Sequence, residues 1–242
     1  MQADYSIFRR LWRIIYPPFL LIAIQLVGTI IVAFLIALFY GLKEIINGSS
    51  ASLIAAIDGE VLSVISNNFM IIQIVSQLAC LAVFLPMWLR TRKEIETSRN
   101  SNPVVITLVI AGFFAAFNVV QMFIFTFTDL FRFFPSYDEV TQVITNESII
   151  TQLLAVGIAA PIIEELVFRG IVINRMSWMP VWLTVLIQGV LFAAVHMNLF
   201  QALYAFFAGI LLGLVYIKFR SLIIVIIGHM AYNIISVITL HS

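Results

Sequence analysis

The sequence predicts an all-α fold, a polytopic bundle of about seven transmembrane helices. The first observation is composition: of 242 residues, 62% are hydrophobic and 10% are charged, and the mean hydropathy of +1.10 lies far above that of soluble domains. The second is spacing, because apolar runs recur at about 20 residues, the length that crosses a hydrocarbon layer of about 30 Å. The third is that these runs lack barrel-type alternation, so helices must satisfy the backbone in lipid. We therefore expect a single integral membrane domain, residues 1–242.

The apolar runs follow one another along the chain. Arg9, Arg10 and Arg13 precede the first run, which is longer than the core of a signal peptide, so we expect it to remain as a spanning helix. Segment 49–67 is interrupted by two acids and a glycine at 58–60. An amphipathic surface helix is favoured there over an eighth membrane element. The seven expected spans cover residues 17–40, 69–89, 104–128, 149–170, 181–198, 200–217 and 222–240.

Charge predicts the orientation of these spans. With the N-terminus inside, the inner segments hold 11 of the 13 basic residues, and the positive-inside rule then gives a cytoplasmic N-terminus and an outer C-terminus. The net charge of +1, without a basic run, gives no reason to expect nucleic-acid binding. Cys80 is the only cysteine, which excludes an internal disulfide. The inner basic residues are Arg9, Arg10, Arg13, Arg90, Arg92, Lys93, Arg99, Arg169, Arg175, Lys218 and Arg220.

Two adjacent acids, Glu164 and Glu165, stand inside the fourth apolar run. Carboxylates at membrane depth are costly and rare, so they mark functional sites by default. Glu165 and Arg169 are four residues apart with the acid first, the favoured order for a helical ion pair. Glu164 is rotated by about 100° and has no cation at that spacing. It is the better candidate for a general base, because apolar surroundings favour proton uptake by a carboxylate.

The fourth and fifth spans are expected to form a hairpin around Pro180, which suits the first turn of a helix. Glu164 precedes this proline by the same interval in sequence as His196 follows it. At about 1.5 Å per residue both stand about 24 Å from the turn, so the hairpin brings the carboxylate and the imidazole to one depth. Phe192 lies four residues before His196, on the same predicted face and beside the predicted site.

The last span supplies two further polar groups, His229 and Asn233, which share one helix face and can both donate hydrogen bonds to a developing oxyanion. Gly209 and Gly213 form a small-xxx-small pattern that we expect to bring the last span against the hairpin. A single membrane His or Asn commonly makes only an interhelical hydrogen bond, but four such groups on three helices indicate a site. The candidate catalytic residues are Glu164, His196, His229 and Asn233, with Glu165, Arg169 and Phe192 in support.

The order of three motifs, Glu164-Glu165-xxx-Arg169, Phe192-xxx-His196 and His229-xxx-Asn233, resembles that of the CPBP (or Abi) intramembrane endopeptidases. The resemblance covers about residues 147–240, the helices expected to bear the catalytic motifs. That family includes the CaaX-processing Ras- and a-factor-converting enzyme and bacterial relatives linked to bacteriocin maturation or self-immunity.

The resemblance implies hydrolysis of a peptide bond in a membrane-associated protein or peptide, of CAAX type or in bacteriocin or leader processing. It implies that Glu164 activates the attacking water, which His196 helps to hold, while His229 and Asn233 stabilise the oxyanion. Glu165 and Arg169 would brace the site. The partners implied are a protein or peptide substrate and the lipid bilayer, in a bacterial plasma membrane.

No cofactor is favoured, although zinc held by Glu164, His196 and His229 stays open, because family members are described both as metalloproteases and as metal-independent glutamate proteases. There is no H-E-x-x-H motif, and Asn233 is a poor zinc ligand. Two other functions remain. A non-catalytic bacteriocin-immunity or membrane partner is disfavoured by the intact motifs. A proton-coupled transporter is disfavoured because the first three spans carry no acid and do not repeat the second half.

Overall fold

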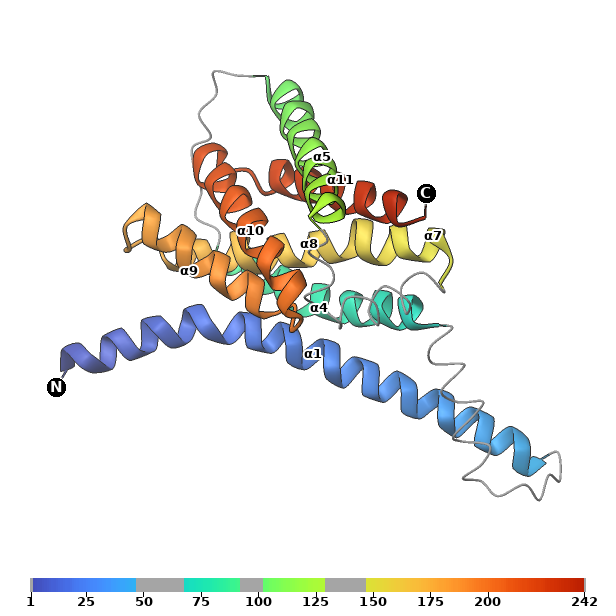
Figure 1. Ribbon diagram of the computed structural model, residues 1–242. Coiled ribbons are helices and arrows are strands. Elements are labelled where there is room, and N and C mark those ends of the chain that lie inside the picture. Colours follow the sequence, from blue (N-terminus) through green and yellow to red (C-terminus); the bar gives the residue numbers. More distant parts are fainter. Residues whose placement is uncertain (1, 47–67, 92–101, 129–146, 242) are drawn as a thin grey trace.

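The computed structural model describes residues 2–46, 68–91, 102–128 and 147–241, and segment 49–67 lies outside these ranges. Within them the chain forms helices without strands (Figure 1). The first three are α1 (Gln2–Ile46), α4 (Phe69–Thr91) and α5 (Pro103–Phe127). The second half contains α7 (Ile149–Gln152), η3 (Leu153–Ala159), α8 (Ala160–Glu165), η4 (Leu166–Ile173), α9 (Val181–Ala194), α10 (Leu199–Phe219) and α11 (Leu222–Leu240).

Within the ranges that the structure describes, five helices are long and apolar enough to cross a membrane: α1, α4, α5, α10 and α11. The protein is therefore an integral membrane protein, and the expected all-α bundle is confirmed. Two of the seven expected spans differ in detail. The run 149–173 is helical throughout but alternates between α and π winding, in the segments α7, η3, α8 and η4. The span expected at 181–198 is wrong at its end, because α9 stops at Ala194.

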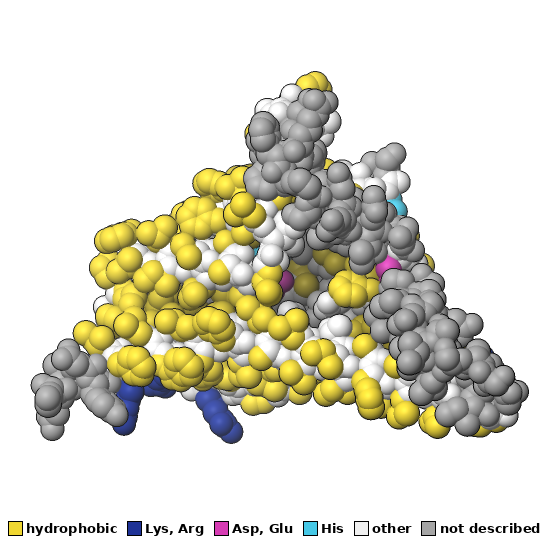
Figure 2. All heavy atoms as spheres, turned by 60° about the horizontal axis from the view of Figure 1, so that its bottom comes forward, with side chains coloured by type: hydrophobic (Ala, Val, Ile, Leu, Met, Phe, Trp, Pro, Cys, Tyr) yellow, Lys and Arg dark blue, Asp and Glu magenta, His cyan; other side chains and the backbone are white. Residues whose placement is uncertain are grey.

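The helices pack in pairs around the run 149–173. Helix α1 packs on α4, α5 on α11, and α9 on α10, while the central run contacts α4 and α11 along much of its length (Figure 1). All eight residues of η4 are buried. The outer helices turn large apolar side chains outward, and Figure 2 shows a broad hydrophobic face with Lys and Arg side chains at the end where α1 begins. The core thus lies around the helix that carries the two glutamates.

Polar side chains define where several helices begin. The Oδ1 atoms of Asn102 and Asn198 accept hydrogen bonds from backbone amides in the first turns of α5 and α10, both at 3.0 Å. Glu147 caps the start of α4 although it is distant in sequence: its Oε1 accepts a hydrogen bond from the Met70 amide at 3.1 Å. This contact fixes the start of α4 beside the start of the central run.

Glycines allow α9 and α10 to approach closely. A Cβ atom on Gly213 would lie 2.5 Å from Nε2 of Gln188, and one on Gly209 would lie 3.3 Å from Cα of Gly189. The Gly209–Gly213 pair therefore faces α9. We expected this pair to bring the last span, α11, against the hairpin, and this expectation is wrong because the two glycines pack on α9. Helix α11 lies against both α5 and the central run, and a Cβ on Gly228 would lie 3.1 Å from the Ile110 side chain of α5.

Candidate functional site

The two adjacent glutamates on α8 occupy different surroundings. The side chain of Glu165 is fully buried, whereas that of Glu164 is 18% exposed. Oε1 of Glu165 accepts a hydrogen bond from Nη1 of Arg169 at 2.8 Å, so the ion pair expected from the i,i+4 spacing is present. Glu164 makes no such pair and faces the opening described below.

Arg169 ties the central run to two other helices. Its second amino group, Nη2, donates to the carbonyl of Gly209 at 3.1 Å, and the same carbonyl accepts from Nε2 of Gln188 at 2.6 Å. The Arg169 guanidinium carbon lies 4.6 Å from the centroid of the Phe192 ring. A fully buried cation is tolerated here because an anion, a carbonyl and a ring face all surround it.

His229 stands between the two glutamates. Its Nδ1 lies 2.8 Å from Oε1 of Glu165, and its Nε2 lies 3.7 Å from Oε2 of Glu164. An ionised carboxylate can only accept, so the short contact assigns a proton to Nδ1. Nε2 is then the atom that faces Glu164. The bond to Glu165 joins distant parts of the chain, and sequence reasoning missed it. The sequence did contain a signal for it, because two carboxylates stand near one arginine at this depth and one carboxylate therefore needs another partner.

Asn233 makes a bond that sequence reasoning also missed. Its Nδ2 donates to the carbonyl of Val156 at 2.9 Å. At the end of η3 the amide of Ala160 bonds to the carbonyl of Ala155, in the π pattern. Pro161 has no N–H to continue this pattern, so the Val156 carbonyl is left free for Asn233. The proline therefore explains how α11 is attached to the central run.

His196 lies beyond the end of α9, in a turn where Met197 has a φ of 53°. This corrects the expectation that His196 and Phe192 share a helix. The two still touch: Nδ1 of His196 is 2.8 Å from the Phe192 carbonyl, and the rings meet edge to face at 5.1 Å. Phe192 also meets His229 at 5.8 Å between ring centroids. One phenyl ring thus positions both imidazoles.

A single cavity of about 250 Å³ is lined by all four candidate catalytic residues, Glu164, His196, His229 and Asn233. Since a water takes about 30 Å³ of liquid volume, the cavity has room for water and part of a substrate. Glu165 and Arg169 lie behind its wall. In the described ranges, no group of three or more His, Cys, Asp or Glu side chains is arranged to hold a metal ion.

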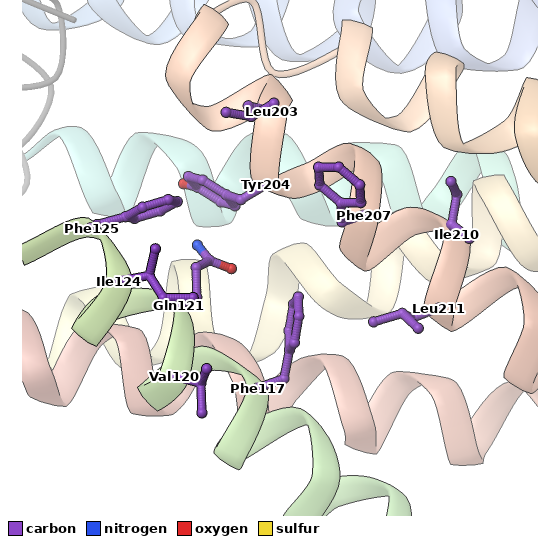
Figure 3. Close-up of a pocket in the computed structure, with 10 residues that line it drawn as sticks. All are labelled: Phe117, Val120, Gln121, Ile124, Phe125, Leu203, Tyr204, Phe207, Ile210 and Leu211. Atoms are coloured by element: carbon purple, nitrogen blue, oxygen red, sulfur yellow. The ribbon is translucent and has the colours of Figure 1, made fainter. Parts of the chain in front are cut away.

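An apolar cleft of about 330 Å³ lies beside this cavity, between α5 and α10 (Figure 3). Phe117 on α5 points toward Phe207 on α10 across it, and Phe125 lies beside Tyr204. Tyr204 lines both the cleft and the cavity. The polar site is therefore bordered by an apolar cleft.

The second half of the chain matches known sequences. Residues 146–235 match a family model described as "Type II CAAX prenyl endopeptidase Rce1-like". A protein of Escherichia coli described as "Uncharacterized 24.3 kDa protein" is 33% identical over 106 residues, which cover 40% of this chain and 48% of that protein. The match thus spans about half of that relative. No solved structure matches the chain significantly. Residues 146–235, which contain the whole candidate site, are thus similar to the Rce1-like type II CAAX prenyl endopeptidases.

Proposed function

We propose that this protein is an intramembrane endopeptidase that cleaves a peptide bond in a membrane-associated protein or peptide. The observation that carries the proposal is the separation of the two glutamates. Glu164 lines a cavity with both imidazoles, while Glu165 is buried behind it in bonds to Arg169 and His229. An accessible carboxylate in a cavity with two imidazoles can act as the general base of a hydrolysis. The family match favours a CAAX-type substrate, with bacteriocin or leader processing as the related alternative.

In the proposed reaction Glu164 takes a proton from a water in the cavity, and the water oxygen bonds to the carbonyl carbon of the substrate. The carbonyl π electrons move to its oxygen and give a tetrahedral oxyanion. When this collapses, the bond to nitrogen breaks and Glu164 returns its proton to the leaving amine. His196 lines the same cavity and is proposed to hold the water. These steps need no metal ion.

His229 is proposed to stabilise the oxyanion through Nε2. In the imidazolium form both ring nitrogens donate, so Nδ1 remains bonded to Glu165 while Nε2 serves the cavity. The charges of Arg169, Glu165, Glu164 and this imidazolium then sum to zero, which favours the arrangement in a membrane. Asn233 gives one amide hydrogen to Val156 and has a second for the oxyanion.

We further propose a bacterial plasma membrane location with the N-terminus in the cytoplasm. The support is the charge distribution of the sequence, which assigns 11 of the 13 basic residues to the inner side, although the structure places one of these, Arg169, in the buried site. Arg10, Arg13, Arg90 and Arg175 come from three separate parts of the chain and line one cavity. This end of the bundle would face the cytoplasm.

The test is a cleavage assay on purified protein in detergent with a fluorescent peptide library that includes prenylated CAAX peptides. Wild type is expected to cleave members of the library, and Glu164→Ala is expected to cleave none at equal expression and equal melting temperature. Equal cleavage by the two proteins would contradict the role of Glu164. Cleavage by neither would favour the immunity-partner function instead.

A further inference from the structure

A second cavity, of about 410 Å³, lies at the end of the bundle where α1 begins, apart from the candidate active site. Four arginines line it: Arg10 and Arg13 on α1, Arg90 on α4, and Arg175 just after η4. We call it the arginine cavity. Arg175 lies about three helical turns after Glu164 on the central run, which separates the two sites by roughly 16 Å along the helix.

The positive charge of the arginine cavity is not neutralised by any residue that the structure describes. Arg175 donates to neutral acceptors, the Arg13 carbonyl at 2.6 Å and the Tyr16 hydroxyl at 3.0 Å, and its Nε is buried without a partner. The Arg10 guanidinium stacks over the Trp178 ring at 5.4 Å. Among the described ion pairs none involves these arginines. Four guanidinium groups around one space form a site suited to phosphate oxygens.

The tryptophans place this cavity at the membrane surface. The chain has four tryptophans. Trp12, Trp88 and Trp178 each lie within a few residues of an arginine of the cavity, and Trp182 is in the first turn of α9. Three of them are 44–68% exposed although they are large and apolar. Tryptophan concentrates at the level of lipid headgroups, so the arginine cavity lies at headgroup depth.

An exposed apolar face of α1 beside the cavity fits the remainder of a lipid. It is formed by α1 residues alone, among them Trp12, Tyr16 and Phe19. Tyr16 joins this face to the cavity, because the guanidinium carbon of Arg175 lies 5.0 Å over its ring. From this geometry we propose that the arginine cavity binds the phosphate of an anionic phospholipid, with an acyl chain lying along the apolar face of α1.

The test measures lipid binding to the full chain in a zwitterionic detergent, by native mass spectrometry and by melting temperature. The probes are phosphatidylglycerol, phosphatidylcholine and inorganic phosphate at equal concentration. Wild type is expected to retain phosphatidylglycerol and to melt at a higher temperature with it. The variant Arg10→Gln/Arg90→Gln is expected to bind it at least ten-fold more weakly, while the matched variant Lys218→Gln/Arg220→Gln binds as wild type does.

Each contrary result would overturn the proposal. An equal loss of phosphatidylglycerol binding in both double variants would mean that only the total charge of the protein matters. Phosphatidylcholine binding as tight as that of phosphatidylglycerol would show that the site does not prefer anionic lipids. Inorganic phosphate binding as tightly as the lipid would identify a free phosphate site. Melting without added lipid checks that each variant folds. If the double variant does not fold, Arg90→Gln replaces it, because the Arg90 side chain makes no hydrogen bond to a described residue, and unchanged binding by that variant would refute the site.

Discussion

Replacing Glu165 and replacing Glu164 should have opposite consequences, although the two residues are adjacent. Glu165→Ala removes the carboxylate that both Arg169 and His229 contact at 2.8 Å. Arg169 is fully buried, so its charge would be left without an anion. Removing one member of a buried ion pair costs about 3–5 kcal/mol. For a chain of this size that corresponds to a fall in melting temperature of roughly 6–20 °C.

Glu164→Gln should leave stability almost unchanged. The side chain is 18% exposed, and its nearest charged partner, Nε2 of His229, lies 3.7 Å away, beyond hydrogen-bond distance. The expected loss of stability is about 1 kcal/mol or less, as for substitutions away from buried networks. The cleavage rate should fall by about 10²–10⁴-fold, because glutamine cannot accept the proton of the attacking water.

The assay pairs the melting temperature of each variant in detergent with its rate on one cleaved peptide. Equal amounts of wild type, Glu164→Gln, Glu165→Gln and Glu165→Ala would be compared. The reasoning is refuted if Glu164→Gln cleaves at the wild-type rate while Glu165→Gln is inactive at an unchanged melting temperature. That result would exchange the roles of the two glutamates.

Three further predictions concern two helix contacts and the need for a metal ion. Asn233→Ala should lower the free energy of unfolding by about 1 kcal/mol, because the Val156 carbonyl loses its hydrogen bond. Adding Pro161→Ala should recover part of this loss, because an alanine at 161 has an N–H for that carbonyl. Additive losses of stability in the double variant would contradict this. Gly213→Ala should destabilise the protein by about 1–3 kcal/mol. Gly112→Ala should not, because a Cβ atom there meets nothing within 4 Å. Equal melting temperatures of the two variants would count against the close approach of α9 and α10. Cleavage should persist in strong chelators; stoichiometric zinc whose removal abolishes activity and whose return restores it would show that the reaction needs the metal.

Much of the bundle could be predicted because membrane helices follow local rules. Apolar length and composition predicted five of the seven spans as the structure has them, and the i,i+4 rule predicted the pair of Glu165 with Arg169. The equal spacing of Glu164 and His196 about Pro180 predicted that they would reach one depth, and both line one cavity. These features depend only on helix geometry.

The rest depends on contacts between distant segments, which no local pattern encodes. His229 bonds to Glu165 from another helix, and the partner of a lone imidazole cannot be read from its neighbours in sequence. The π winding of η3 and η4 differs from α winding by one residue in the hydrogen-bond pattern, and only Pro161 hinted at it. The end of α9 at Ala194 was missed because the apolar composition continues past it.

The shortness of α9 bears on how water would reach the proposed hydrolysis. Its helical residues rise about 21 Å in all, some 9 Å less than a hydrocarbon layer of about 30 Å. The helix begins next to the exposed Trp178 and Trp182, at headgroup depth, and so ends inside the layer. The turn that follows has polar backbone groups and His196, and lipid tails cannot solvate them. Such a turn is tolerated at membrane depth where it lines a polar cavity, and His196 lines the cavity that also holds Glu164. Water in this cavity would then reach Glu164 without a pore through the bilayer.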